Sequence, residues 1–174
     1  MTVEYVISVL QKAVLIVGAL TLVYAALHDV AARTIPNTAS VILAVLGIAT
    51  HVADGTILLS LLIAAIVFTV CALCWMRGWM GGGDVKLLTA AALFVLPGSV
   101  GLMIVATSMF GGGVAVIYLV AREIVRRIPP PKGPPPRNFL ARVLRAEHWR
   151  LLRGAPLPYG SAIAAGTLFS LFPG

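Results

Sequence analysis

The sequence predicts an all-α, polytopic membrane protein with about six transmembrane helices. Of its 174 residues, 60% are hydrophobic and only 11% are charged, and the mean hydropathy is +1.01. A soluble domain is about half apolar and about a quarter charged, so this composition excludes an ordinary soluble fold. The length suits one membrane-embedded domain covering residues 1–174.

The apolar runs set the predicted spans. A helix needs about 20 apolar residues to cross a bilayer, with a range of roughly 17–25. Six runs meet or approach this length, and we expect helices over residues 13–30, 38–53, 56–76, 84–97, 98–121 and 157–173. The second and fourth are short, so we expect neighbouring helices to shield them or the bilayer to be locally thin.

The basic residues predict the orientation, because Lys and Arg accumulate in cytoplasmic loops. With the N-terminus outside, the cytoplasmic segments are about 28–37, 77–86 and 122–156, and they hold every basic residue except Lys12. A re-entrant fourth segment would move the large basic cluster of the last loop outside, and we reject it for that reason. The net charge of +7 therefore indicates a membrane topology, and nucleic acid is not an expected partner.

The loop 122–156 has two predicted parts. The run Pro129–Pro136 cannot be helical and is typical of a stiff spacer. Asn138 then caps a predicted interfacial helix, 139–153, whose basic residues face anionic lipid headgroups. Glu147 falls within the apolar arc of this helix and does not fit the pattern. A solvated basic loop that only fixes the topology explains the segment equally well.

Two aspartates lie at the edges of apolar runs. Asp29 ends the first predicted span and Asp84 begins the fourth, so the topology puts both at the cytoplasmic face. A carboxylate at the centre of a membrane helix costs about 2.5–3.5 kcal/mol on insertion scales, and less near the interface. Such residues favour a functional site. Asp54 lies beside Gly55 in an outer turn, where Asp is a usual turn residue, and we do not expect it to take part in a reaction.

Paired carboxyl groups can hydrolyse an amide without a metal. When they lie close together, one keeps its proton and polarises a carbonyl, while the ionised one takes a proton from water. The three histidines are far apart in the sequence, and Cys71 and Cys74 are expected to be packing residues of an apolar span. No metal and no cofactor is therefore expected.

Three glycines, Gly81, Gly82 and Gly83, directly precede Asp84. Glycine lets the backbone turn sharply and lets another chain approach it closely, so an extended substrate segment could lie beside the carboxyl. A flexible loop followed by a helix cap explains the same residues equally well, because Asp is favoured at the start of a helix.

Three motifs together resemble those of the type IV prepilin peptidases, which are membrane aspartic proteases with a Gly-x-Gly-Asp signature. The first is Asp29 with Arg33 and Ile35-Pro36-Asn37, and the second is Gly81-Gly82-Gly83-Asp84-Val85-Lys86-Leu87. The third is Leu157-Pro158-Tyr159-Gly160, which resembles the segment that opens the last span of this family. The resemblance implies that Asp29 and Asp84 are the catalytic carboxyls.

The resemblance also implies the substrate and the location. Such enzymes remove the basic leader of prepilins or pseudopilins at the cytoplasmic face of the bacterial inner membrane. Larger members carry an extra domain with two CxxC pairs that is linked to N-methylation. This chain lacks that domain and resembles the short form of tight-adherence (Flp) pili, so no methyltransferase activity is expected.

The other motif residues are expected to shape the site. Pro36 and Asn37 end one helix and begin the next. Arg33 and Lys86 are expected to be interfacial anchors, and Lys86 also lies within reach of Asp84. The segment Pro158-Tyr159-Gly160 is expected to shape the start of a helix beside the site.

Rival functions remain at this point. A small proton- or cation-coupled transporter could use the same acids, but it would be expected to hold them at mid-bilayer. An inactive scaffold would have no reason to keep both acids. The other Gly-x-Gly-Asp proteases, which cut within transmembrane helices, resemble this chain only around Asp84.

Overall fold

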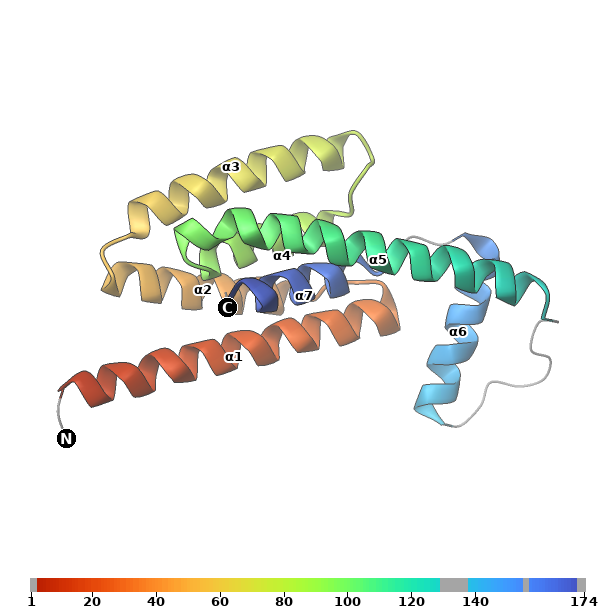
Figure 1. Ribbon diagram of the computed structural model, residues 1–174, viewed down its shortest axis with the longest axis horizontal. Helices are drawn as coiled ribbons and strands as arrows, with labels where there is room; N and C mark the ends of the chain where they lie inside the picture. The colour runs from red at the N-terminus through yellow and green to blue at the C-terminus, as the bar shows by residue number, and fades with distance from the viewer. Residues whose placement is uncertain (1–2, 129–137, 155–156, 172–174) are drawn as a thin grey trace.

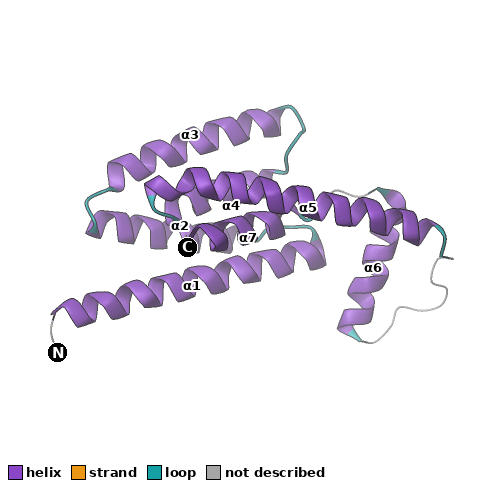
Figure 2. Cartoon of the chain, in the orientation of Figure 1, coloured by secondary structure: helices purple, strands orange, loops and turns teal. Residues whose placement is uncertain are grey.

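Seven α-helices and one short 3₁₀ turn form the part of the chain described by the computed structural model, residues 3–128, 138–154 and 157–171 (Figure 1). No strand occurs in those residues (Figure 2), which confirms the all-α prediction. The elements are α1 (Val3–Ala32), α2 (Asn37–Ala53), α3 (Ile57–Met76), α4 (Gly82–Phe94), η1 (Pro97–Ser99), α5 (Val100–Arg126), α6 (Phe139–Arg153) and α7 (Tyr159–Leu171).

Six of these helices run back and forth along one direction, and α6 lies across one end of the bundle (Figure 1). Helices α1, α3 and α5 are long and apolar enough to cross a membrane by themselves. Helix α2 has 17 residues, and α4 and α7 have 13 each. At about 1.5 Å per residue, a 13-residue helix is roughly 20 Å long, so α4 and α7 are shorter than the hydrocarbon core. The predicted shortness of the second and fourth helices is confirmed.

Several predicted boundaries were wrong. The first helix begins at Val3 and not at residue 13, because polar residues such as Gln11 and Lys12 do not stop a helix that has no Pro. The fourth begins at Gly82 and ends at Phe94, and the fifth continues to Arg126. The predicted helix 139–153 has the same bounds in the structure, while the Pro-rich segment before it lies outside the described residues.

Helix α4 forms the centre of the bundle. It packs mainly against α2 and α3, and also against α7. Its buried residues include Leu87, Ala91 and Phe94. Large apolar side chains on the outer helices are exposed, for example Leu58 at 81% and Leu20 at 64%. Because lipid tails are as apolar as these side chains, this pattern is stable in a membrane and unstable in water.

Glycine allows the backbones of packed helices to approach closely. A Cβ atom added to Gly47 in α2 would lie 2.7 Å from the carbonyl carbon of Leu93 and 2.9 Å from Cα of Phe94. Gly166 in α7 makes a similar approach to the backbone of Thr107 in α5. Small residues at helix contacts are typical of membrane proteins, where van der Waals packing stabilises helix association.

A buried histidine joins the two turns at the end of the bundle remote from α6. His51, which is 1% exposed, contacts Oγ1 of Thr56 through Nδ1 at 2.9 Å and the carbonyl of Val95 through Nε2 at 3.2 Å. Both ring nitrogens are satisfied if Nε2 donates to Val95 and Nδ1 accepts from Thr56. His51 therefore has a structural role in connecting the α2–α3 and α4–α5 turns.

We expect Gly47→Ala to destabilise the protein by about 1–3 kcal/mol, because the new methyl group would force α2 away from α4. Gly112→Ala in α5 is the matched control, since a Cβ there meets nothing within 4 Å. The midpoint of thermal unfolding in detergent micelles should fall for Gly47→Ala and stay equal or rise for Gly112→Ala. Equal midpoints for both variants would contradict the packing described here.

Candidate active site

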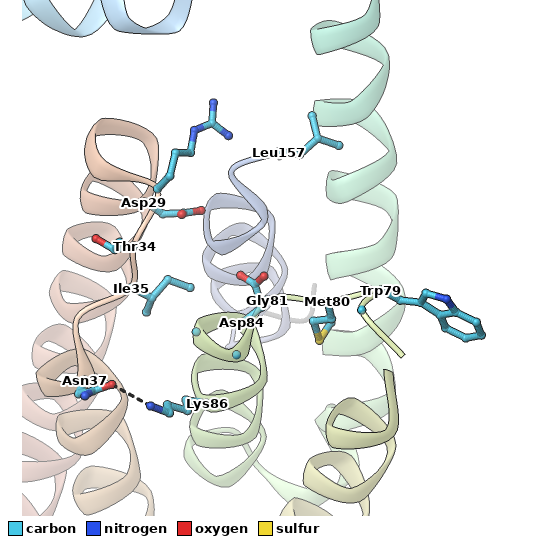
Figure 3. A pocket seen from close by; sticks show the side chains of 14 residues that line it. Asp29, Thr34, Ile35, Asn37, Trp79, Met80, Gly81, Asp84, Lys86 and Leu157 are labelled. Carbon is cyan, nitrogen blue, oxygen red and sulfur yellow. Dashed lines mark hydrogen bonds between the residues drawn. The ribbon is translucent and has the colours of Figure 1, made fainter. Parts of the chain in front are cut away.

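A cavity of about 630 Å³ lies at the end of the bundle near α6. Asp29 and Asp84 both line it, and their carboxyl groups point into it from α1 and α4 (Figure 3). The wall comes from the end of α1, the α1–α2 connection, the α3–α4 connection and the start of α4. Its other residues are Arg33, Thr34, Ile35, Asn37, Gly78, Trp79, Met80, Gly81, Gly82, Gly83, Lys86 and Leu157.

Asp29 is held by the first turn of α7. The backbone N–H of Gly160 donates a hydrogen bond of 2.8 Å to Oδ2 of Asp29, whose residue is only 6% exposed. Gly160 is the second residue of α7, and the first N–H groups of a helix have no partner within the helix. The carboxyl group of Asp29 therefore satisfies one of these donors and lies at the positive end of the α7 dipole.

Asp84 is held by the first turn of its own helix. It is the third residue of α4, and its carboxyl lies against the backbone of Gly81, where an added Cβ would be 2.9 Å from Oδ2 of Asp84. A carboxyl group in the first turn of a helix also complements the helix dipole. Asp84 therefore suits the start of α4 and lines the cavity.

The glycines beside the two carboxyls leave no room for a side chain. An added Cβ would lie 2.9 Å from Oδ2 of Asp84 at Gly81, and 2.9 Å from Oδ2 of Asp29 at Gly160. At Gly83 it would lie 3.3 Å from Cβ of Ile35. These distances explain why the turn before α4 and the start of α7 are made of glycine.

The predicted site residues fall into two groups. Arg33, Asn37, Lys86 and the three glycines line the cavity, and Nζ of Lys86 donates to Oδ1 of Asn37 at 3.2 Å, which links α4 to the start of α2 (Figure 3). Pro36, Pro158 and Tyr159 lie outside the wall. Pro36 precedes α2 in an extended conformation, and the ring of Tyr159 packs on Gly111 of α5.

Arg33 differs from its expected role as a membrane anchor. It has a left-handed backbone, with φ of +56°, and its side chain is only 14% exposed. Its guanidinium donates to Oε2 of Glu147 at 2.6 Å and to the hydroxyl of Tyr118 at 2.8 Å. Glu147, the residue that did not fit the apolar arc of α6, is therefore a partner of Arg33.

Glu147 is ionised at neutral pH. Burial raises the pKa of this carboxyl, but the hydrogen bonds from Arg150 and Tyr118 and the charge of Arg33 lower it by more. The pKa of Glu147 thus lies below its ordinary value, and its charge persists to a lower pH than that of a free glutamate.

Sequence reasoning missed several wall residues. Thr34, Met80 and Leu157 line the cavity but were not among the predicted site residues. Thr34 and Leu157 lie within the first and third motifs and Met80 directly precedes the second, which is the signal that could have found them. Trp79 is 72% exposed and also lines the cavity, with the guanidinium of Arg77 5.4 Å from its ring centre.

The chemistry available here is that of carboxyl groups. Two of them face one cavity. A hydrogen bond from the backbone N–H of Gly160 fixes Asp29, and Asp84 lies in the first turn of α4. Among the described residues, no group of three or more His, Cys, Asp or Glu side chains could hold a metal ion. The pair can exchange protons with a water molecule and with the oxygen of a bound carbonyl group.

Comparisons with known proteins agree with this arrangement. The model of the type IV leader peptidase family matches residues 16–117, a range that contains Asp29 and Asp84. Searches of curated proteins and of solved structures found no match. Because the family match covers more than half of the sequence, the chain belongs to the type IV leader peptidase family.

Proposed function

We propose that this protein is an aspartic endopeptidase that removes the leader of type IV prepilins or pseudopilins, with Asp29 and Asp84 as the catalytic carboxyls. The observation that carries the proposal is their convergence on one cavity from separate helices. Membership of the leader peptidase family supports the reaction class. A transporter would be expected to hold its acids at mid-bilayer, whereas Asp29 lies one turn from the end of α1 and Asp84 lies in the first turn of α4.

The proposed reaction uses one water molecule and no covalent intermediate. The ionised carboxyl takes a proton from water as the water oxygen bonds to the scissile carbonyl carbon. The protonated carboxyl gives its proton to the carbonyl oxygen, so the tetrahedral intermediate carries two hydroxyl groups. The carboxyl that took the proton from water then gives it to the leaving nitrogen as the carbon–nitrogen bond breaks. One hydroxyl of the intermediate returns its proton to the other carboxyl, which releases a new carboxyl group and a free amine and restores both aspartates.

The cavity suits a short stretch of extended chain. Its volume of about 630 Å³ is comparable to that of typical small-ligand sites, roughly 300–1,000 Å³. The bare backbone of Gly81–Gly83 forms part of its wall and would let a substrate backbone approach Asp84 closely.

The distribution of charge supports a cytoplasmic site in the bacterial inner membrane. Arg33 and Lys86 line the cavity, and the basic helix α6 lies across the same end of the bundle (Figure 1). Since basic residues favour the cytoplasmic side, this end would face the cytoplasm. The chain also resembles the short enzymes of Flp pili, and we propose that it cleaves without methylating.

We expect Asp29→Asn and Asp84→Asn each to lower the rate of leader removal by about 10²–10⁴-fold, because an amide can neither accept the proton from water nor donate as a carboxylic acid. Asp54→Asn, in the turn after α2 at the opposite end of the bundle, is the matched control and should cleave normally. The assay is the mobility shift of a prepilin in membranes that contain equal amounts of each variant. Cleavage at the normal rate by either Asp29→Asn or Asp84→Asn would overturn the assignment.

We expect Gly160→Ala to lower kcat by about 10–100-fold with little change in KM, because the added methyl group displaces the carboxyl of Asp29 by a fraction of an ångström. Gly113→Ala in α5 serves as the control, since its Cβ would meet nothing within 4 Å. Steady-state cleavage kinetics in detergent separate the two constants. A normal kcat for Gly160→Ala would show that the contact between α7 and Asp29 does not matter for the reaction.

A further inference from the structure

Helix α6 contacts the last turn of α1 through polar side chains. It lies across the end of the bundle (Figure 1), and two of its residues, Glu147 and Arg150, face the segment that follows Asp29. Neither residue lines the cavity that holds the two carboxyls. Their contacts nevertheless involve the backbone on the C-terminal side of Asp29.

Arg150 caps the end of α1. Its guanidinium donates to the carbonyl of Val30 at 3.0 Å and to the carbonyl of Ala31 at 2.9 Å. The last four carbonyl groups of a helix have no partner within the helix, and a cation there also complements the helix dipole. The two carbonyls belong to the residues immediately after Asp29, so this contact fixes the turn that carries the carboxyl.

Glu147 connects three groups around that turn. It accepts from Arg150 at 2.5 Å, from Arg33 at 2.6 Å and from the hydroxyl of Tyr118 in α5 at 2.9 Å. Its side chain is 15% exposed, so these charge-assisted hydrogen bonds are partly shielded from solvent and from salt.

Arg33 connects Glu147 to the backbone of Asp29. Its backbone N–H donates to the carbonyl of Asp29 at 2.8 Å, and its left-handed conformation ends α1. The chain then turns so that Thr34 and Ile35 enter the cavity wall. A left-handed backbone is unfavourable for a residue with a side chain, so the surrounding contacts must maintain it.

One segment of the chain therefore holds Asp29 from two sides. Arg150 binds the backbone just after it, and Gly160 binds its carboxyl group. Both contacts come from the part of the chain that includes α6 and α7: Gly154, with φ of +66°, follows the last residue of α6, and α7 begins five residues later.

We propose that α6 is a clamp that positions Asp29 for the reaction, with Arg150 and Glu147 as positioning residues of the peptidase. The inference rests on the proposed function, because it assumes that Asp29 is catalytic. Helix ends open more readily than helix centres, and a small displacement of a reacting group costs a large factor in rate. In this proposal, α6 keeps the hydrogen bonds of the last turn of α1 formed, so that the carboxyl of Asp29 stays in place.

The test compares Arg150→Met with Arg127→Met. Methionine keeps most of the length of the side chain and removes the donors. The side chain of Arg127 is 77% exposed and pairs with the neighbouring Glu123 of its own helix end at 3.1 Å, so it serves as the control. We expect Arg150→Met to lower kcat by about 10–100-fold with KM within about twofold, and Arg127→Met to match the unmodified protein. Arg150→Lys should recover part of the loss, because the ammonium keeps the positive charge and N–H donors but lacks the second guanidinium nitrogen.

Hydrogen–deuterium exchange supplies a readout that does not depend on cleavage. The amide of Arg33 should exchange faster in Arg150→Met and in Glu147→Gln, and at the normal rate in Arg127→Met. If Arg150→Met does not accumulate, Tyr118→Phe removes the two hydrogen bonds that this hydroxyl makes with Arg33 and Glu147, leaves the ion pairs of the cluster in place, and should give a smaller change in the same direction. The clamp proposal would be overturned if the Arg33 amide of Arg150→Met exchanged at the normal rate. A normal kcat for this variant, or a rise in KM alone, would also overturn it.

Asp29→Asn belongs in the same set of variants. If it cleaves normally, the proposed function fails, while the exchange of the Arg33 amide in Arg150→Met still decides whether α6 fixes the end of α1. If it is inactive and Arg150→Met has normal kcat, the proposed function stands and the clamp fails.

Discussion

The hydrogen bond from the Gly160 backbone to Asp29 joins the last helix to the first, and the geometry of the cavity depends on it. A carboxyl group buried at the end of an apolar bundle needs donors, because burial without partners is costly. The backbone N–H of Gly160 supplies one at the start of α7 without bringing a side chain into the cavity. That solution demands glycine at Gly160 and Gly81, where a methyl group would press on the carboxyl oxygens.

The unequal lengths of the helices create the space for the site. Helices α4 and α7 have 13 residues each, whereas α5 has 27 and runs past their first turns (Figure 1). Their N-termini are therefore recessed between longer neighbours. Close packing at Gly47 and Gly166, and the bridge made by His51 at the far end, fix α4 and α7 relative to the long helices. The fold thus presents two helix starts to one pocket at an end of the bundle.

Much of this arrangement could be predicted from the sequence. The apolar runs indicated the crossing helices, the two aspartates marked the same end of the bundle, and the bounds of α6 agree with the predicted helix. The contacts between distant segments could not be predicted, because no periodicity encodes them. The pairing of Arg33 with Glu147, 114 positions apart, is the clearest example. Glu147 seemed misplaced within its own helix because its partners belong to α1 and α5.

The central claim is that Asp29 and Asp84 act together on one bound peptide. The most direct measurement is a structure of the protein with a leader peptide whose scissile amide is replaced by a hydroxyethylene group, a mimic of the tetrahedral intermediate. The account predicts that the hydroxyl of this group lies about 2.6–3.2 Å from a carboxyl oxygen of Asp29 and the same distance from one of Asp84. A hydroxyl that contacts only one of the two carboxyls, or neither, would contradict it.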